Sequence, residues 1–308
     1  MAFNWDIHGS NLAVLPIDTK GRQNKGNVPL LYAHGEFVTD FTFSPFDDGL
    51  LATGSQDSTI KLWKIPEEGM PSKGINAPEL TLTEEQRRIE TLDFSPAADC
   101  VLASSSNDSL TLWDLIKEEQ LYTFDGHDDE VQSVSWQTNA NLIATQSKDR
   151  MLRILDPRSS DAALQCDSHQ GTKDSKVVWL ADGRVLTTGF GSDRAREITI
   201  RDVRFLNNRQ HHLSLDISSG ILVPLYDPDT NMCFLCGKGD RTMQFVEISD
   251  KDPFIIEGLK HSGEQSKGAC LVPKRAMDVM QGEVNRVLQL CDSSIVPVTW
   301  QVPRKVSR

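Results

Sequence analysis

A short segment near residue 51 recurs along the chain, and this repeat limits the fold more than any other feature of the sequence. The segment 51–63, LATGSQDSTIKLW, returns one residue shorter as LASSSNDSLTLW at 102–113. A third copy at 143–156 has Leu155 in place of the tryptophan, and a longer fourth copy at 186–202 has Arg201 there. Self-similarity at a period of roughly 40–50 residues indicates an array of like supersecondary units.

The runs before the first three copies predict the secondary structure of one unit. Apolar and polar residues alternate at 38–43, 89–94 and 131–136, which is the period of two typical of β-strands. Turn-forming residues, such as those at 45–49 and 227–229, separate the runs. Each unit is therefore expected to be a set of short antiparallel strands joined by tight turns.

Repeats of this length that end in a Trp-Asp-like pair are typical of WD40 blades, and one four-stranded blade cannot bury both of its faces alone. We therefore predict an all-β fold, a WD40-type β-propeller, seven-bladed with an incomplete first blade. Residues 1–308 are expected to form a single β-propeller domain, with 1–25 as the partial first blade and 30–303 as six further blades. The chain would then begin inside a blade, so that either ring closure is imperfect or the natural chain is longer.

Composition excludes several classes of protein. The formal net charge of -12 and the sequence pI of about 5.0 oppose general binding to nucleic acid, which depends on clustered Lys and Arg. No apolar run is long enough for a transmembrane segment, and the N-terminal residues do not form a signal peptide pattern, so we expect a cytoplasmic protein. The six cysteines are scattered, and no disulfides are expected in that compartment.

The set of His34, Asp57, Thr53 or Ser55, and Trp63 could suggest a Ser/His/Asp type of catalytic site. Nucleophilic catalysis also needs an oxyanion site and an oriented base, whereas in WD40 blades this same set forms a structural hydrogen-bond network. We favour the structural interpretation, because buried His and Asp side chains require satisfied polar atoms. The equivalents in the later repeats are predicted to be Asp108, Trp113, His127 and Asp149. The second repeat has no His at the expected place, near Glu84.

Three short motifs could bind a metal or a phosphate, and each is incomplete. Cys233 and Cys236 form C-x-x-C, but no second Cys or His pair lies at zinc-site spacing. The segment 227–238 opens like a calcium loop but has Met232 and Lys238 where Gly and Glu are required. Residues 237–240 lack the spacing of a phosphate-binding loop. We therefore predict no metal and no cofactor.

The chain resembles the coronin family in several segments. GILVPLYDPDT at 220–230, CGKGD at 236–240, LTTGF at 186–190 and the ending VPRK at 302–305 look like coronin hallmarks. Further similarity comes from 14–17, 148–158 and 273–275, and the segments 43–48, 280–290 and 295–297 resemble the long coronins, which have two propellers and lack the trimerising coiled coil. The chain departs from the family in lacking its basic N-terminal lead-in and in ending directly after 302–305.

This resemblance implies partners and a location. Short coronins bind actin filaments, and the long kind is associated with actin organisation, with export from the Golgi and with ubiquitin-linked trafficking control. The implied partners are actin filaments and trafficking proteins, without a coiled coil for self-assembly. The implied location is the cytoplasm, at the cytoskeleton and at Golgi or vesicle membranes.

A run of arginines is the richest local source of positive charge and the candidate partner-binding surface. It consists of Arg194, Arg196, Arg201, Arg204 and Arg209. On an acidic protein such a cluster could meet an acidic partner such as actin. The alternative is a solvated face with local ion pairs. The pairs 87–88, 274–275 and 304–305 are weaker candidates of the same kind.

Three functions follow as hypotheses. The first is a scaffold that binds actin filaments, and the second is an adaptor in trafficking or ubiquitin-linked control that does not bind actin. The third is a propeller enzyme, which would require convergent acid, base or metal groups, and we find no such cluster in the sequence. We predict a binding protein that is not an enzyme.

Overall fold

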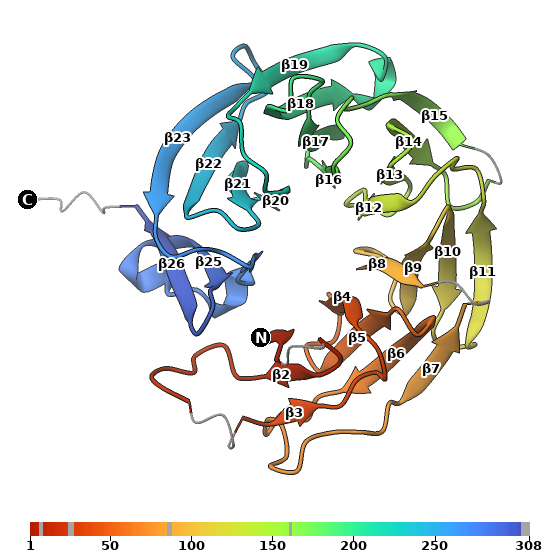
Figure 1. Ribbon diagram of the computed structural model, residues 1–308, viewed down its shortest axis with the longest axis vertical. Helices are drawn as coiled ribbons and strands as arrows, with labels where there is room; N and C mark the ends of the chain where they lie inside the picture. The colour runs from red at the N-terminus through yellow and green to blue at the C-terminus, as the bar shows by residue number, and fades with distance from the viewer. Residues whose placement is uncertain (6–8, 24–27, 85–87, 160–161, 303–308) are drawn as a thin grey trace, which may run out of the picture. The chain divides into compact units, whose positions relative to one another are not determined.

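The computed structural model describes residues 1–5, 9–23, 28–84, 88–159 and 162–302 (Figure 1). Within these residues it contains 26 β-strands in seven antiparallel sheets, together with three short 3-10 helices. The chain separates into two compact units, Met1–Ser168 and His169–Arg308. The predicted single domain stays a prediction, and each unit is described by itself.

The first unit contains one three-stranded sheet and three four-stranded sheets. The three-stranded sheet consists of β1 (Ala2–Asn4), β2 (Leu12–Val14) and β3 (Leu30–Leu31). The others are β4 (Val38–Phe43), β5 (Leu50–Ser55), β6 (Thr59–Lys64) and β7 (Leu80–Thr83); β8 (Ile89–Phe94), β9 (Val101–Ser106), β10 (Ser109–Asp114) and β11 (Glu119–Phe124); and β12 (Val131–Trp136), β13 (Ile143–Ser147), β14 (Met151–Leu155) and β15 (Ala162–Asp167). Because β3 belongs to the first sheet, that sheet extends past the predicted boundary at residue 25.

The second unit contains two four-stranded sheets and one three-stranded sheet. They are β16 (Lys176–Trp179), β17 (Arg184–Phe190), β18 (Arg196–Asp202) and β19 (Arg209–Ser214); β20 (Leu222–Asp227), β21 (Met232–Gly237), β22 (Thr242–Ile248) and β23 (Ile255–Ser262); and β24 (Gly268–Leu271), β25 (Glu283–Leu290) and β26 (Ile295–Gln301). The 3-10 helices are η2 (Val203–Phe205), η3 (Lys274–Ala276) and η4 (Val279–Gln281).

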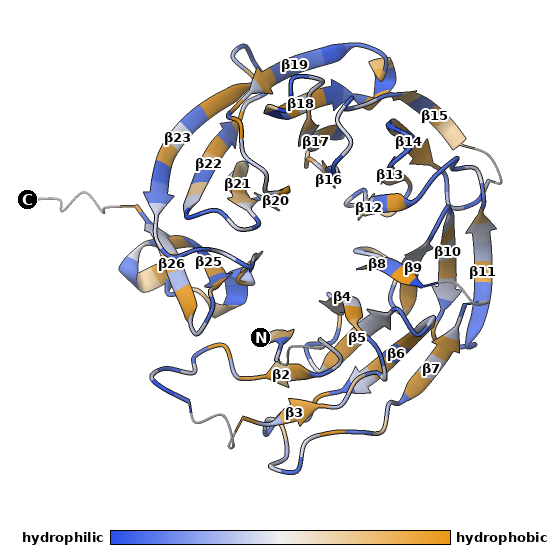
Figure 2. Ribbon diagram, viewed as in Figure 1, coloured by the Kyte–Doolittle hydropathy of each residue, from blue (hydrophilic) through white to orange (hydrophobic). Residues whose placement is uncertain are grey.

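Burial explains which strands carry apolar residues. The middle strands β9, β10, β17 and β18 are almost wholly buried, whereas the fourth strands β11, β19 and β23 are mostly exposed. Figure 2 shows the matching pattern, with many hydrophilic residues along these three strands. Apolar residues of consecutive sheets meet between them, as where Ile60 and Leu62 pack with Ile89 and Trp113. Each sheet thus completes its core only with a neighbour.

Candidate functional site

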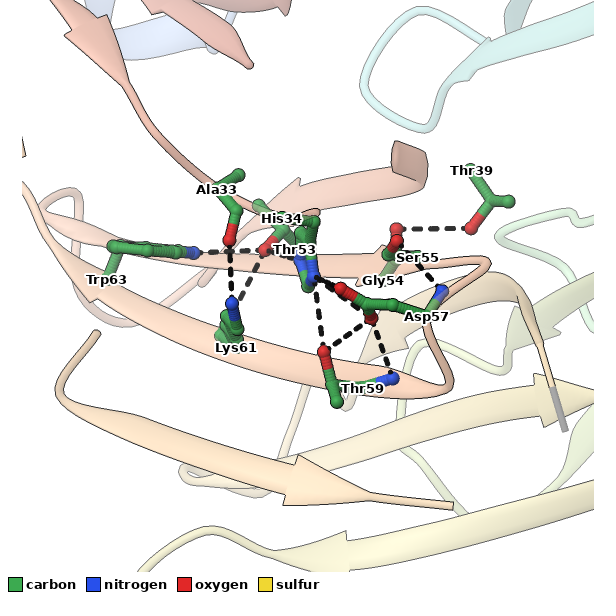
Figure 3. Close-up of polar contacts among 10 residues, drawn as sticks. All are labelled: Ala33, His34, Thr39, Thr53, Gly54, Ser55, Asp57, Thr59, Lys61 and Trp63. Atoms are coloured by element: carbon green, nitrogen blue, oxygen red, sulfur yellow. Dashed lines mark hydrogen bonds and ion pairs between the residues drawn. The ribbon is translucent and has the colours of Figure 1, made fainter. Parts of the chain in front are cut away.

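A chain of hydrogen bonds joins the four predicted residues of the β4–β7 sheet (Figure 3). The indole Nε1 of Trp63 on β6 donates to Thr53 Oγ1 on β5 at 2.9 Å. Thr53 Oγ1 lies 2.8 Å from His34 Nε2, and His34 Nδ1 lies 2.9 Å from Asp57 Oδ2. The hydroxyl and main-chain N–H of Thr59 both donate to Asp57, which fixes the carboxylate in the turn between the two strands.

The protonation states follow from burial and from these partners. Burial lowers the pKa of His34, and the neighbouring Asp57 only partly offsets this. Burial would raise the pKa of Asp57, but the hydrogen bond from Thr59 and the contact with His34 outweigh it and hold the pKa below its ordinary value. The geometry therefore fits a neutral imidazole whose Nδ1–H donates to Asp57 and whose Nε2 accepts from the Thr53 hydroxyl.

Access decides between the catalytic and the structural interpretation of this set. Thr53 and Trp63 have no exposed surface, and His34 is 8% exposed. A hydroxyl that solvent cannot reach offers no path for a substrate carbonyl, so Thr53 is not placed to act as a nucleophile. We interpret the set as a brace between β5, β6 and the segment that enters β4.

The β8–β11 sheet uses a carboxylate where the previous sheet has a histidine. Trp113 Nε1 donates to Ser104 Oγ at 2.9 Å, and Ser104 Oγ donates to Glu84 Oε1 at 3.3 Å. Glu84 is 6% exposed and precedes β8, as His34 precedes β4. The sequence prediction noted the missing histidine but did not identify Glu84 as its replacement.

The β12–β15 sheet corrects two predicted roles. His127 Nε2 lies 2.9 Å from Thr145 Oγ1, but His127 Nδ1 lies 3.1 Å from the main-chain oxygen of Asp108. Asp149 instead accepts from Arg153 at 2.6 Å. Neither Asp108 nor Asp149 therefore reproduces the carboxylate contact that Asp57 makes with His34. Arg153 accounts for this difference, because a buried cation requires the nearby carboxylate more than a neutral imidazole does.

A histidine network in the β16–β19 sheet was missed at the sequence level. His169 Nε2 lies 2.9 Å from Thr187 Oγ1, and His169 Nδ1 lies 2.6 Å from Glu197 Oε1. The spacing of histidine and threonine could have identified this network. In the three networks that contain a histidine, it precedes its threonine partner by 19, 18 and 18 residues. Glu197 escaped notice because its carboxylate comes from β18 and not from the turn before it.

The structure does not gather the five predicted arginines on one surface. Arg196 is 6% exposed and binds Asp216 and Asp240, and Arg201 is 3% exposed and donates to the Leu206 carbonyl at 3.1 Å. These two cannot contact a partner, so their assignment to an exposed basic surface is wrong.

The remaining three arginines are exposed but lie at opposite ends of β18, with Arg194 at one end and Arg204 and Arg209 at the other. Arg194 precedes β18, while Arg204 follows its other end in η2, and Arg209 begins β19 opposite Arg201. A strand of this length spans about 20 Å. Arg88 is exposed and paired with Glu130, whereas Arg87, Arg304 and Lys305 lie outside the described residues.

The motifs considered for metal binding have other partners. Cys233 packs in the cluster with Leu235 and Val246, whereas Cys236 packs with Phe234 in a different cluster. Because residues three apart on a strand face opposite sides, the two thiols do not share a site. Burial raises the pKa of both, that of Cys236 to about 12. In the described part of the chain no group of three or more His, Cys, Asp or Glu side chains could hold a metal ion.

Among the described residues, no helix is long and apolar enough to cross a bilayer.

The chain matches a family model, curated protein sequences and solved structures. Residues 27–64 and 118–156 match the family model described as WD domain, G-beta repeat. Coronin-7 of Homo sapiens is 40% identical over 310 residues, which cover 99% of this chain and 33% of that protein, and Coronin-7 of Mus musculus is 38% identical over the same shares. The crystal structure of the WD40 domain from Toxoplasma gondii coronin matches with a TM-score of 0.92 at 30% identity, covering 99% of this chain and 79% of that one.

The chain belongs to the coronin family. The seven sheets and the Toxoplasma neighbour give this coronin the predicted fold class, an all-β seven-bladed WD40 propeller. A chain of the mitotic checkpoint complex, at 18% identity and a TM-score of 0.71, shows the fold alone. This coronin spans about a third of the length of the curated relatives that it matches, in agreement with the predicted resemblance to the long kind.

Two cations, the half-buried Lys274 and the buried Arg196, join the coronin-like segments of the second unit. Lys274 Nζ donates to Asp227 at 2.6 Å, to the Val284 carbonyl at 2.6 Å and to Asn285 at 2.8 Å. This single ammonium thus links segment 220–230 with segment 273–275 and with β25. Arg196 links β18 to Asp240 in the same way. Asp227, which the calcium-loop reading would require as a ligand, is already neutralised by Lys274.

Proposed function

We propose that this coronin is a scaffold that binds actin filaments without turnover. It would support cytoskeleton organisation and Golgi-linked vesicle trafficking in the cytoplasm. The observation that carries the proposal is the match to coronins along the whole chain, 40% identity to Coronin-7 over 99% of its length. Actin binding comes to this chain from the family resemblance and not from its own geometry.

The polar groups of the sheets support binding over catalysis. The histidines His34, His127 and His169 each use both ring nitrogens in hydrogen bonds inside the protein. The side chains of their threonine partners are at most 1% exposed. Such groups hold strands together, and these three histidines are not free to act as an acid or base on a substrate.

Charge favours a second candidate, an adaptor in trafficking or ubiquitin-linked control that does not bind actin. The formal net charge of -12 makes the molecule as a whole repel acidic partners at long range. An actin-binding surface must then rely on local positive charge.

Cosedimentation with actin filaments at low and at physiological salt tests the proposal. Binding that weakens as salt rises would support the actin scaffold, because screened charges contribute less to the contact. A protein that stays in the supernatant at both salt concentrations would contradict actin binding and favour the adaptor. Arg196 is not a suitable position for a charge variant in this assay, because its guanidinium pairs with Asp216 and Asp240 inside the protein.

A further inference from the structure

Positive charge is distributed unevenly along this acidic chain. Residues 1–168 contain 27 Asp and Glu against 13 Lys and Arg, a formal charge of -14. Residues 169–308 contain 17 acidic and 19 basic side chains, a formal charge of +2. An acidic partner would therefore meet least repulsion at the second unit.

A hub of hydrogen bonds gathers three loops of the second unit. The Arg196 guanidinium donates to Asp216 at 2.6 Å and also to Asp240, which accepts from Ser218 Oγ at 3.0 Å. Lys173 Nζ reaches the neighbouring Ser219 carbonyl at 2.7 Å. The segments before β16 and β20 and the turn before β22 are thereby held to one another and to the first residue of β18.

Five exposed cations surround this hub, and we call them the basic rim. Its members are Lys173, Arg194, Lys238, Arg241 and Lys260. Arg194 lies two residues from Arg196, and Lys238 and Arg241 flank Asp240 in the chain. Lys260, on β23, helps to lower the pKa of Asp216, although the hydrogen bond from Arg196 is the larger cause.

The cations of the rim are available to a partner. Within the described residues, the ion pairs of the hub join Asp216 and Asp240 to the buried Arg196, and no ion pair under 4.0 Å involves a member of the rim. Lys173 is the most fixed of the five, because its ammonium also lies 5.0 Å from the centroid of the Phe190 ring. An exposed cation without a carboxylate partner can form a new pair with little internal rearrangement.

The hub itself does not offer a small-molecule site. The cavity lined by Arg196, Asp216, Asp240, Gln244 and Lys260 has a volume of about 50 Å³, room for a few waters only. The rim is therefore a surface that meets another surface.

We propose that the basic rim is a docking surface for an acidic protein surface, one that presents separated Asp and Glu side chains. The inference rests on the proposed function, in which the actin filament supplies that surface. Asp174, Asp193 and Asp216 stand among the cations, and they would repel the dense phosphates of a lipid bilayer or a nucleic acid while leaving room for spaced carboxylates. Guanidinium groups such as those of Arg194 and Arg241 also match carboxylate geometry.

The test compares Lys238→Glu/Arg241→Glu with a control of equal charge change outside the rim, Arg204→Glu/Lys251→Glu. A charge-neutral version, Lys238→Gln/Arg241→Gln, guards against disruption of the nearby Asp240 contacts, and thermal unfolding of all variants checks that each is folded. Three binding readouts are used: cosedimentation with actin filaments, retention on a carboxymethyl resin at low salt, and binding to phosphatidylserine vesicles.

We expect the rim variants to lose filament affinity and resin retention by roughly tenfold or more, and the control to change by less than about twofold. If wild-type protein binds filaments and the rim variants bind them equally well, the rim is not the docking surface although the proposed function stands. If no filament binding occurs but the resin still retains wild-type protein through the rim, the proposed function fails and the acid-binding surface remains. If the carboxymethyl resin does not retain the wild-type protein, or retains the rim variants equally well, the inference is overturned. It is also overturned if the rim promotes binding to phosphatidylserine vesicles more than binding to filaments and to the resin.

Discussion

The hydroxyl of Thr53 is the hydrogen-bond partner of both the Trp63 indole and the His34 imidazole. Thr53→Val keeps the shape of the side chain and removes its hydroxyl, so two buried polar groups lose a partner. We expect the free energy of unfolding to fall by about 1–3 kcal/mol, measured by denaturant titration.

Thr81→Val is the matched control, because Thr81 is exposed on β7 of the same sheet. Its expected effect is within about 0.5 kcal/mol. Equal effects at the two positions would contradict a special role for the buried hydroxyl.

His127 predicts a dependence of stability on pH. Burial, reinforced by the positive charge of Arg153, lowers its pKa from 6.5 to about 4. Between these values the unfolded chain binds a proton that the folded protein does not, so stability falls as pH drops from about 6.5 to about 4. The contribution is roughly 3 kcal/mol at most. His127→Gln should remove this slope, as measured by denaturant titrations across that range, and an unchanged slope would show that another group produces it.

Asp93 on β8 acts in the opposite direction. Burial, with a smaller contribution from Asp40, raises the pKa of Asp93 to about 7. The folded protein then binds more protons than the unfolded chain between about pH 4 and pH 7, so this group lowers stability as pH rises through that window. Asp93→Asn should steepen the net rise of stability with pH, since it leaves the His127 slope unopposed. The same titrations check this, and a flatter profile in the variant would contradict the assignment.

At the residue scale, the sequence predicted which side chains repeat but not all of their contacts. His34, Thr53, Asp57 and Trp63 were found because the first repeat matches its pattern fully. Glu84 and Glu197 were not: Glu84 takes the place of a histidine, whereas Glu197 supplies from β18 the carboxylate that Asp57 supplies from a turn. Either replacement works only if the reach of the side chain suits the local backbone. That depends on three-dimensional positions that spacing does not contain.

At the scale of elements, Lys274 connects a turn of one sheet to a strand of the next. Lys274→Met would leave the buried carboxylate of Asp227 without its cation, and we expect a loss of about 3 kcal/mol in unfolding free energy. The double variant Lys274→Met/Asp227→Asn should recover part of that loss, because no charge is then left buried alone.

Lys267→Met provides the comparison, because the Lys267–Asp292 pair is exposed on both sides. Its expected effect is within about 1 kcal/mol. A double variant no more stable than Lys274→Met would show that packing of the lysine stem, and not charge, connects the two elements.

Strands with clear alternation, such as β4, β8 and β12, were predictable from the sequence. The two residues of β3 were not, since so short a strand has no measurable period and forms because β2 offers it an edge. The buried arginines were misplaced for a related reason. Arg196 and Arg201 lie on β18, whose first six residues are all buried, so polarity alone wrongly suggested exposure.

At the scale of the molecule, the repeat was sufficient to predict an all-β propeller, because closing a set of blades is the way such units bury their faces. The uneven charge predicts a different response of the two units to salt. Added salt should slow amide hydrogen exchange in β8–β15 more than in β16–β26, because it screens the self-repulsion of residues 1–168. Exchange measured segment by segment at low and high salt tests this, and equal changes in both units would contradict it.

The strand β26 has a consequence for solubility. In the described part of the chain no strand pairs with the outer edge of β26. The unpaired backbone groups of such an edge can pair with a strand of another molecule and so promote aggregation. The fourth strands β11, β19 and β23 carry charged residues, whereas Ile295–Gln301 carries none and has Pro297 near its middle. Pro297 has no backbone N–H to donate to an incoming strand. A fibre that grew from this edge would therefore lack one backbone hydrogen bond at Pro297 for every molecule added.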